Sequence, residues 1–231
     1  MERFNRTEML IGNENVEKLQ KSSVIVFGLG GVGGSLCEAL VRSGIGNISI
    51  VDKDTVDVTN INRQVIATED TIGKLKTKAM EERLKSINPN VNIEIYDVNV
   101  GRDTIDLFDL SKYDYVADAI DMVTSKILLV EHAKAADTKI IMAMGMGNKI
   151  DPTKIEIADI SKTSVCRLSR VLRRELKKRN IKNVLVAYSK EETRTPVFKL
   201  ENEATPGSVS FVPPVCGMIM AGTIVKDLIS L

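Results

Sequence analysis

The chain has 231 residues, of which 43% are hydrophobic and 27% are charged, and its formal net charge is +1. This composition can bury one sizeable core, and it excludes global disorder and a surface that is basic everywhere. The three cysteines are far apart and form no Cys-x-x-Cys pair, which argues against a structural zinc site and a disulfide framework. The sequence shows no apolar signal core and no apolar run long enough to span a membrane. These observations predict a cytoplasmic protein.

Strands and helices are expected to alternate through the first part of the chain. Apolar runs predict strands at 22–29, 47–54, 91–98, 113–120 and 139–147. Helical patterns lie between them at 33–44, 77–88 and 124–137. This alternation is typical of a Rossmann-like, doubly wound α/β fold, whose mostly parallel sheet has helices on both faces. We interpret 1–150 as a nucleotide-binding core.

The pattern changes after residue 150. Strands are predicted at 154–161 and 183–189, on either side of a basic helix at 164–180. Residues 190–214 hold four of the six prolines and indicate a loop, and an apolar helix over 216–231 is expected to pack back on the sheet. We interpret 151–231 as a substrate-facing extension of the same domain.

A glycine-rich turn joins the first predicted strand to the first helix of the core. Gly28, Gly30 and Gly33 form G-x-G-x-x-G within "GLGGVGG". The glycines permit a tight turn that phosphate can approach, and the helix N-terminus adds amide donors and partial positive charge. Asp52 ends the second strand, where a carboxylate can accept hydrogen bonds from ribose hydroxyls. This turn predicts a nucleotide site, and it fits NAD as well as ATP.

The residues that follow the second strand favour ATP. Asn60 and Gln64 accompany Arg63, a planar fork for two phosphate oxygens, and Lys76, a point charge. A dinucleotide carries only a pyrophosphate, which the helix N-terminus already holds. ATP instead expels a pyrophosphate, whose developing charge must be stabilised. This set of cations therefore indicates a triphosphate site.

Two aspartates follow the fourth strand in "VADAID". Ligands bind at the carboxyl ends of the strands in open α/β sheets, and a carboxylate there can hold a Mg²⁺ that bridges phosphate oxygens. Asp121 lies past the strand in a loop, so we predict it as the magnesium ligand. Asp118 is interpreted as structural, capping the next turn. The candidate catalytic residues are Arg63, Lys76 and Asp121.

Four motifs together carry a resemblance to a known superfamily: "GLGGVGG", "VDKDTVDVTNINRQ", "GKLKTKA" and "DAID". They resemble the adenylating domain of the ubiquitin-activating superfamily, with ThiF, MoeB and HesA, whose members attack the α-phosphate of ATP with a carboxylate. The resemblance implies ATP and Mg²⁺, and a homodimer in which Arg6 of "RFNR" enters the partner's ATP site. The candidate ATP ligands in the chain itself are Gly28, Gly30, Gly31, Gly33, Asp52, Asp54, Asn60, Arg63, Gln64 and Lys76.

Further motifs narrow the substrate. Sulfur-carrier-activating members usually have two Cys-x-x-Cys zinc pairs, which this sequence lacks. The run from Met144 to Arg179, with "VAYSKE" and "GSVSFVPPVCGMIMAG", is similar to the branch that dehydrates threonylcarbamoyladenosine in tRNA to a cyclic form. Two departures from the pattern are Met122, where relatives often have Asn, and Arg167, where Pro is expected after Cys166.

The predicted basic helix supports a nucleic-acid partner. Eight basic residues and a single acidic one lie between Arg167 and Lys182. In a chain with a net charge near zero, this concentration indicates a local surface for a polyanion, although a merely solvated helix is the alternative. The helix contains no aromatic residue, so we expect contacts to phosphates and to shape. The candidate tRNA-binding residues are Arg167, Arg170, Arg173, Arg174, Lys177 and Lys178.

Three other functions stay open on the sequence alone: a sulfur-carrier or ubiquitin-like activating enzyme, an NAD(P)-dependent oxidoreductase and a non-catalytic tRNA-binding module. A sulfur-relay protein is a further candidate partner. Dehydration within one carbamoyl group needs no enzyme thiol, because the nucleophile is intramolecular. Cys166 and Cys216 remain candidate acyl carriers, although the apolar surroundings of Cys216 favour a core position. Cys37 and His132 are interpreted as structural.

Overall fold

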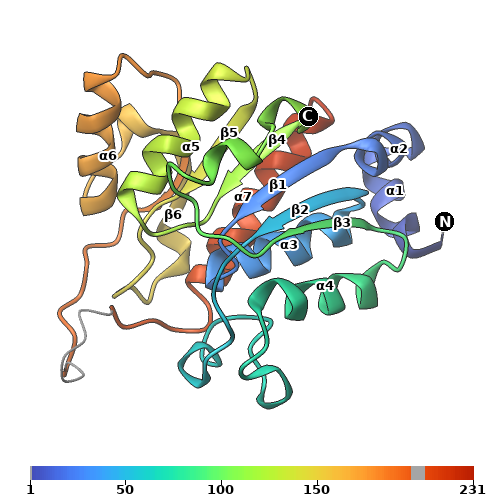
Figure 1. The fold of residues 1–231 in the computed structure, drawn as a ribbon, viewed down its shortest axis with the longest axis horizontal. Helices are drawn as coiled ribbons and strands as arrows, with labels where there is room; N and C mark the ends of the chain where they lie inside the picture. Colours follow the sequence, from blue (N-terminus) through green and yellow to red (C-terminus); the bar gives the residue numbers. More distant parts are fainter. Residues whose placement is uncertain (1, 199–205) are drawn as a thin grey trace.

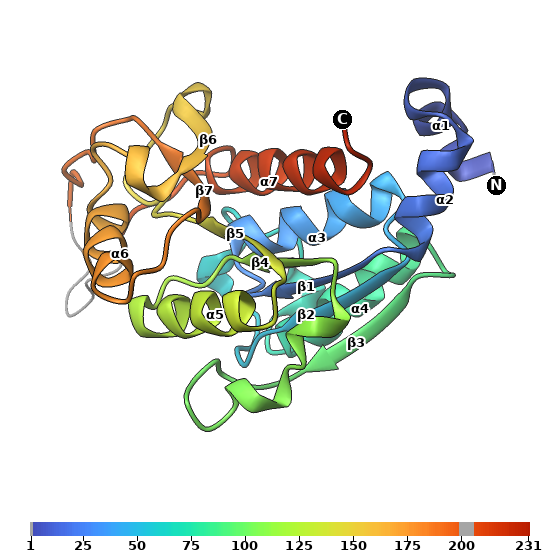
Figure 2. The same cartoon turned by 90° about the horizontal axis from the view of Figure 1, so that it is seen from above.

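The computed structural model describes residues 2–198 and 206–231, which form one sheet between two layers of helices (Figures 1 and 2). The sheet has seven strands in the order β3-β2-β1-β4-β5-β7-β6, and all neighbours are parallel except β6 and β7. The strands are β1 (Ser23–Phe27), β2 (Asn47–Val51), β3 (Asn92–Tyr96), β4 (Tyr115–Asp118), β5 (Lys139–Ala143), β6 (Ile155–Asp159) and β7 (Leu185–Ser189). The predicted doubly wound, mostly parallel α/β fold is confirmed.

The helices divide between the two faces of the sheet. They are α1 (Asn5–Ile11), α2 (Asn13–Lys21), α3 (Gly31–Ser43), α4 (Lys76–Ile87), α5 (Val123–Ala135), α6 (Arg167–Lys178) and α7 (Pro213–Leu228). Apolar residues of α3, α4 and α7 form one core cluster, and those of α5 and α6 form a second cluster on the opposite face (Figure 2). The central strands β1 and β4 are apolar apart from Ser23 and Asp118 at their ends, because both of their faces are covered.

The register of the sheet places the ends of β1, β2 and β4 next to one another. Phe27 at the end of β1 pairs with Val51 of β2 on one side and with Asp118 of β4 on the other. The loops that follow these three strands therefore begin side by side at one edge. The helices α1 and α2 lie at the opposite end of the molecule (Figure 1).

From β1 onward the observed strands and α-helices match the predicted ones, with shifts of a few residues at their ends, whereas the helices α1 and α2 were not predicted. The first core helix begins at Gly31, so that Gly31 and Gly33 lie in its first turn. The last helix begins at Pro213, a residue whose fixed φ suits the first helical position. Residues 190–198 and 206–212 contain no helix or strand, as expected, and 199–205 lie outside the described residues. In the part of the chain that the structure describes, no helix is both long and apolar enough to cross a membrane.

Candidate nucleotide site

The glycine turn is fixed by close backbone packing. Gly28 has φ +88°, in the left-handed region, and a Cβ there would lie 2.9 Å from the carbonyl oxygen of Ala119. A Cβ on Gly33 would lie 1.7 Å from the carbonyl oxygen of Gly28, so only glycine lets α3 start this close to the turn. At Gly30 a Cβ would meet no described atom within 4 Å. Gly28 and Gly33 therefore shape the turn, whereas Gly30 leaves space for a ligand.

Asp52 braces the turn from the end of β2. One carboxylate oxygen accepts a hydrogen bond of 2.6 Å from the Leu29 N–H, and the other accepts one of 2.9 Å from the Asp54 N–H. This bracing role is one that sequence reasoning missed. Each carboxylate oxygen has a second lone pair, so the same group can still accept from a ribose hydroxyl.

A short 3₁₀ turn presents the polar residues that follow β2. It runs over Val58–Asn60 and is capped by Asp57, which accepts from the N–H of Thr59 at 2.8 Å and from its hydroxyl at 2.6 Å. These hydrogen bonds hold the pKa of the Asp57 carboxyl below its usual range. The Nη1 of Arg63 then donates to the Thr59 carbonyl at 2.9 Å and to Asn62 Oδ1 at 2.8 Å. The guanidinium is thus oriented before any ligand arrives.

Lys76 stands at the first position of α4, with its side chain only 8% exposed. Its Nζ lies 3.0 Å from Asp54 Oδ2, and its N–H donates to the Asp54 carbonyl at 2.9 Å. Asp54 therefore orients the ammonium group of Lys76. The sequence motifs predict Asp54 only as a candidate ATP ligand. Gln64 is buried nearby, and its Oε1 has no hydrogen-bond partner among the described residues.

The two aspartates after β4 have different surroundings. Asp118 is fully buried, lies 3.0 Å from Lys126 Nζ and accepts from the Ile120 N–H at 2.9 Å, so its structural role is confirmed. Burial raises the pKa of Asp118, while the Lys126 ammonium acts in the opposite direction. Asp121 is exposed beyond the strand, and its carboxylate accepts no hydrogen bond from residues 2–198 or 206–231. Asp121 is therefore the carboxylate free to bind a cation.

These groups surround one cavity of about 460 Å³ at the carboxyl ends of the strands. Every predicted ATP ligand of the chain lines it except Gly33, which packs behind the turn. Sequence reasoning missed Lys53, Asn99, Gly147 and Ser208, which also line it. Three of these follow strand ends along the chain, and that position is the signal that could have found them.

A larger hollow of about 850 Å³ lies at the opposite end of the sheet, against Arg3, Asn88 and Asn92. Its lining lacks the G-x-G-x-x-G turn and the start of α3, so its size alone does not make it the nucleotide site. Arg6 is an exposed residue of α1 at this same end, and it does not line the 460 Å³ cavity of its own chain.

The basic residues of α6 do not all face solvent freely. The helix buries Leu172 and Leu176 in the second core cluster. Arg167, Arg170 and Lys177 are exposed, and their side chains make no hydrogen bond or ion pair with any described residue. Two others contact Glu175, with N–O distances of 3.5 Å from Arg174 and 2.9 Å from Lys178.

Arg173 differs from the rest of this set. Its Nη1 donates to the carbonyl and the hydroxyl of Thr163, each at 2.7 Å. Its side chain therefore holds the turn before α6, so of the six tRNA-binding candidates it is the one whose side chain is hydrogen-bonded to a described residue outside the helix.

The cysteines lie away from the cavity. Cys37 and Cys216 are fully buried, and burial raises the pKa of the Cys216 thiol to about 12 and that of Cys37 further still. Cys166 caps α6, and its Sγ accepts from the Ser169 N–H at 3.5 Å. His132 faces Asp106 on the surface, with Nε2 3.4 Å from Oδ1. Within the described ranges, no three His, Cys, Asp or Glu side chains are grouped to hold a metal ion.

Comparison with known proteins agrees with this geometry. The model of the ThiF family matches residues 4–231. A tRNA threonylcarbamoyladenosine dehydratase of Bacillus subtilis is 40% identical over 242 residues, covering 99% of this chain and 95% of that protein. The Escherichia coli dehydratase is 38% identical over 176 residues, which are 76% of this chain and 66% of that protein.

A crystal structure of the E. coli dehydratase in complex with ATP superimposes with a TM-score of 0.91 and 32% identity, covering 99% of this chain and 94% of the other. A sulfur carrier protein adenylyltransferase of Thermus thermophilus is 35% identical over 135 residues, which are 58% of this chain and 49% of that protein. The chain is thus similar to proteins that share an adenylating fold and differ in what they act on.

Proposed function

The chain belongs to the ThiF family, and from that premise we propose that it dehydrates threonylcarbamoyladenosine in tRNA at the expense of ATP. The observation that carries the proposal is the cavity at the strand ends, where Arg63, Lys76 and Asp121 meet the glycine turn. The near-full-length similarity to a B. subtilis dehydratase supports the substrate.

The first step activates the carboxylate of the threonyl group. One carboxylate oxygen attacks the α-phosphorus of ATP, and the bond between the α-phosphorus and the bridging oxygen breaks to release pyrophosphate. The N-terminus of α3 and Gly30 hold the phosphates by backbone N–H groups. Arg63 and Lys76 stabilise the charge that develops on the departing pyrophosphate.

The second step closes the ring. A nitrogen or oxygen of the carbamoyl group attacks the acyl carbon and expels AMP, and a carbamoyl N–H gives up its proton, so that the tRNA loses one water in total. The two reacting groups belong to one substituent, and their high effective concentration makes an enzyme thiol unnecessary. The protonated, buried thiols of Cys37 and Cys216 agree with a step that uses neither.

Mg²⁺ completes the proposed site. The Asp121 carboxylate is an exposed oxygen donor at the cavity, and Mg²⁺ bound to nucleotides commonly takes one or two carboxylates beside the phosphates. Bound there, Mg²⁺ neutralises phosphate charge. Asp52 and Asp54 are already engaged by Leu29 and Lys76, which leaves Asp121 as the ligand.

We further propose that the protein acts as a homodimer in the cytoplasm. Arg6 lies at the end of the molecule opposite the cavity, so it can approach an ATP only in a second copy. The exposed cations of α6, which packs beside α5 on one face of the sheet (Figure 1), are proposed to bind tRNA phosphates. A sulfur-relay protein as a partner is a separate hypothesis, and the proposed mechanism does not depend on it.

The decisive experiment supplies ATP, Mg²⁺ and tRNA with or without the threonylcarbamoyl group, then measures AMP and the mass of the nucleoside. We expect AMP and a loss of one water only with the modified tRNA. Exchange of labelled pyrophosphate into ATP that depends instead on a small protein ending in Gly-Gly would identify a sulfur-carrier activating enzyme. Binding of tRNA without AMP formation would identify a non-catalytic module.

A further inference from the structure

Asn148 holds both ends of one segment of the chain. Its N–H donates to the Gly207 carbonyl at 2.7 Å, and its Oδ1 accepts from the Gly207 N–H at 2.7 Å. Its own carbonyl accepts from the Arg194 N–H at 2.9 Å. Asn148, in the loop that follows β5, therefore fixes two positions that are far apart in the sequence.

The backbone of Asn148 explains why it can make all three contacts. Its φ is +56°, in the left-handed region that asparagine adopts more readily than most other side chains. Glycine would tolerate this conformation as well, but glycine has no side-chain oxygen to accept from Gly207. The position therefore needs a residue that both adopts a positive φ and carries a side-chain acceptor, and asparagine does both.

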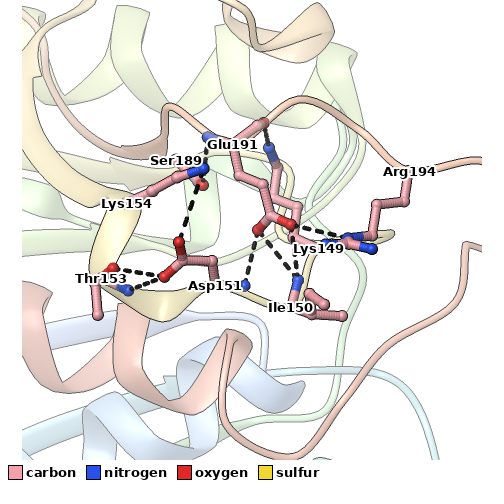
Figure 3. A network of polar contacts seen from close by, with 8 residues as sticks. All are labelled: Lys149, Ile150, Asp151, Thr153, Lys154, Ser189, Glu191 and Arg194. Atoms are coloured by element: carbon pink, nitrogen blue, oxygen red, sulfur yellow. Dashed lines mark hydrogen bonds and ion pairs between the residues drawn. The ribbon is translucent and has the colours of Figure 1, made fainter.

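The chain on the other side of Asn148 is rigidly supported (Figure 3). The Glu191 carboxylate accepts from the N–H groups of Ile150 and Asp151, at 3.1 Å and 2.9 Å, and from Arg194 Nε at 3.3 Å. Lys149 Nζ donates to the Glu191 carbonyl. Lys149 and Glu191 are 3% and 5% exposed, so the centre of this network is buried and keeps Asn148 in place.

A line of contacts leads from Gly207 to the phosphate-binding arginine. Pro206 and Ser208, on either side of Gly207, line the nucleotide cavity. Asn62 Nδ2 donates to the carbonyl and the hydroxyl of Ser208, each at 3.1 Å. The Oδ1 of the same Asn62 accepts from Arg63 Nη1 at 2.8 Å.

We propose that Asn148 is a positioning residue of the ATP site, which holds Gly207 and Ser208 so that Asn62 orients the guanidinium of Arg63. Asn62 is the second positioning residue on this line. The inference rests on the proposed function, because it takes Arg63 to contact the phosphates that leave as pyrophosphate. It names two residues on which that contact depends, and although both lie in stretches that carry the family resemblance, the sequence alone predicts a role for neither of them.

The test measures the dissociation constants of ATP and of AMP, each with Mg²⁺, by calorimetry. Asn148→Gly keeps the backbone conformation and removes Oδ1, and Asn62→Ala removes the link to Arg63. Each variant should weaken ATP binding by about three- to tenfold, the value of one or two hydrogen bonds. AMP binding should stay unchanged, because AMP lacks the β- and γ-phosphates. The double variant should lose little more than either single one, since both act through one line of contacts.

Two further variants control for folding. Asn180→Gly makes the same substitution at another asparagine with positive φ, +55°, at the end of α6, and should bind ATP as the unmodified protein does. Asn148→Asp keeps an acceptor oxygen and should restore ATP affinity. Thermal unfolding of each variant verifies that the fold is intact.

Three results would overturn the inference: unchanged ATP affinity in Asn148→Gly, an equal loss for AMP, or effects that simply add in the double variant. These measurements contain no tRNA. A protein that binds ATP but leaves modified tRNA unchanged would therefore contradict the proposed function alone, and the ATP constants would still decide the role of Asn148.

Discussion

The nucleotide cavity and the outer face of α6 both concentrate charge, but the protein builds them in different ways. In the cavity the two candidate catalytic cations already have partners within the chain: Lys76 pairs with Asp54, and Asn62 holds Arg63. On α6 the exposed side chains of Arg167, Arg170 and Lys177 contact no described residue.

The difference separates two kinds of recognition. Groups held in place cost little to reorganise when charge develops during a reaction, which is what a site that expels pyrophosphate requires. Free cations on a helix surface bind a polyanion through its phosphates, in a manner that depends on salt and little on geometry. The comparison predicts large losses for single changes at the cavity and graded losses on α6.

The largest effect is expected beneath the cavity, where Lys126→Met leaves the buried Asp118 without its cation. Breaking one partner of a buried pair costs about 3–5 kcal/mol, so the free energy of unfolding in urea should fall by that amount. The matched control is Lys139→Met, which breaks an exposed pair with Asp227 at 2.8 Å and should cost less than about 1 kcal/mol. Equal losses of unfolding free energy in the two variants would show that the buried ion pair stabilises the fold no more than the exposed one.

Next in size is the loss of Lys76. Lys76→Ala removes the ammonium held by Asp54, and AMP formation with modified tRNA should fall by about 100- to 1000-fold, as for the loss of one preorganised charge-stabilising group. Lys85→Ala changes an exposed lysine on the same helix, which pairs with Glu81 at 2.7 Å, and should leave the rate near that of the unmodified protein. A normal rate in Lys76→Ala would remove this residue from the mechanism.

A smaller and graded effect is expected on α6. Replacing Arg167, Arg170 and Lys177 together with alanine should weaken tRNA binding about tenfold or more, and should lower the slope of log affinity against log salt by about 2 to 3. ATP affinity should not change. Filter binding at several salt concentrations measures both quantities, and an unaltered slope would mean that tRNA binds elsewhere.

The smallest effect concerns pH and the contact between α3 and α4. Burial alone would raise the pKa of Glu38, but hydrogen bonds from Arg83 at 2.9 Å and Arg42 at 2.8 Å outweigh it, so the pKa lies below its usual range. The stabilisation is therefore present above the ordinary pKa of about 4.3 and is lost as pH falls through the lower, folded-state value.

Urea unfolding from pH 7 to pH 3 tests this directly. Glu38→Gln should reduce stability at pH 7 by about 0.5–1 kcal/mol, the size expected for partly exposed ion pairs, and the difference from the unmodified protein should vanish at the acid end. A difference that persists at pH 3 would point to packing rather than charge.

From the first strand onward, the sequence by itself determined the order of strands and helices along the chain, the glycine turn and most of the polar side chains of the cavity. These follow from local causes: continuous apolar runs where both faces of a strand are covered, glycine where backbones touch, and polar residues directly after strand ends. Because the carboxyl ends of parallel strands meet at one edge, residues as far apart as Gly28, Lys76 and Asp121 could be assigned to one site.

Only the tertiary structure decided which side chain each of these residues contacts. Asp54 orients Lys76, Lys126 neutralises Asp118, and Arg173 is drawn from the helix surface to Thr163. Asn148 contacts Gly207 and Arg194 across long stretches of chain, although the sequence alone predicts no role for it. Such contacts depend on how distant segments pack, and neither composition nor spacing along the chain records that packing.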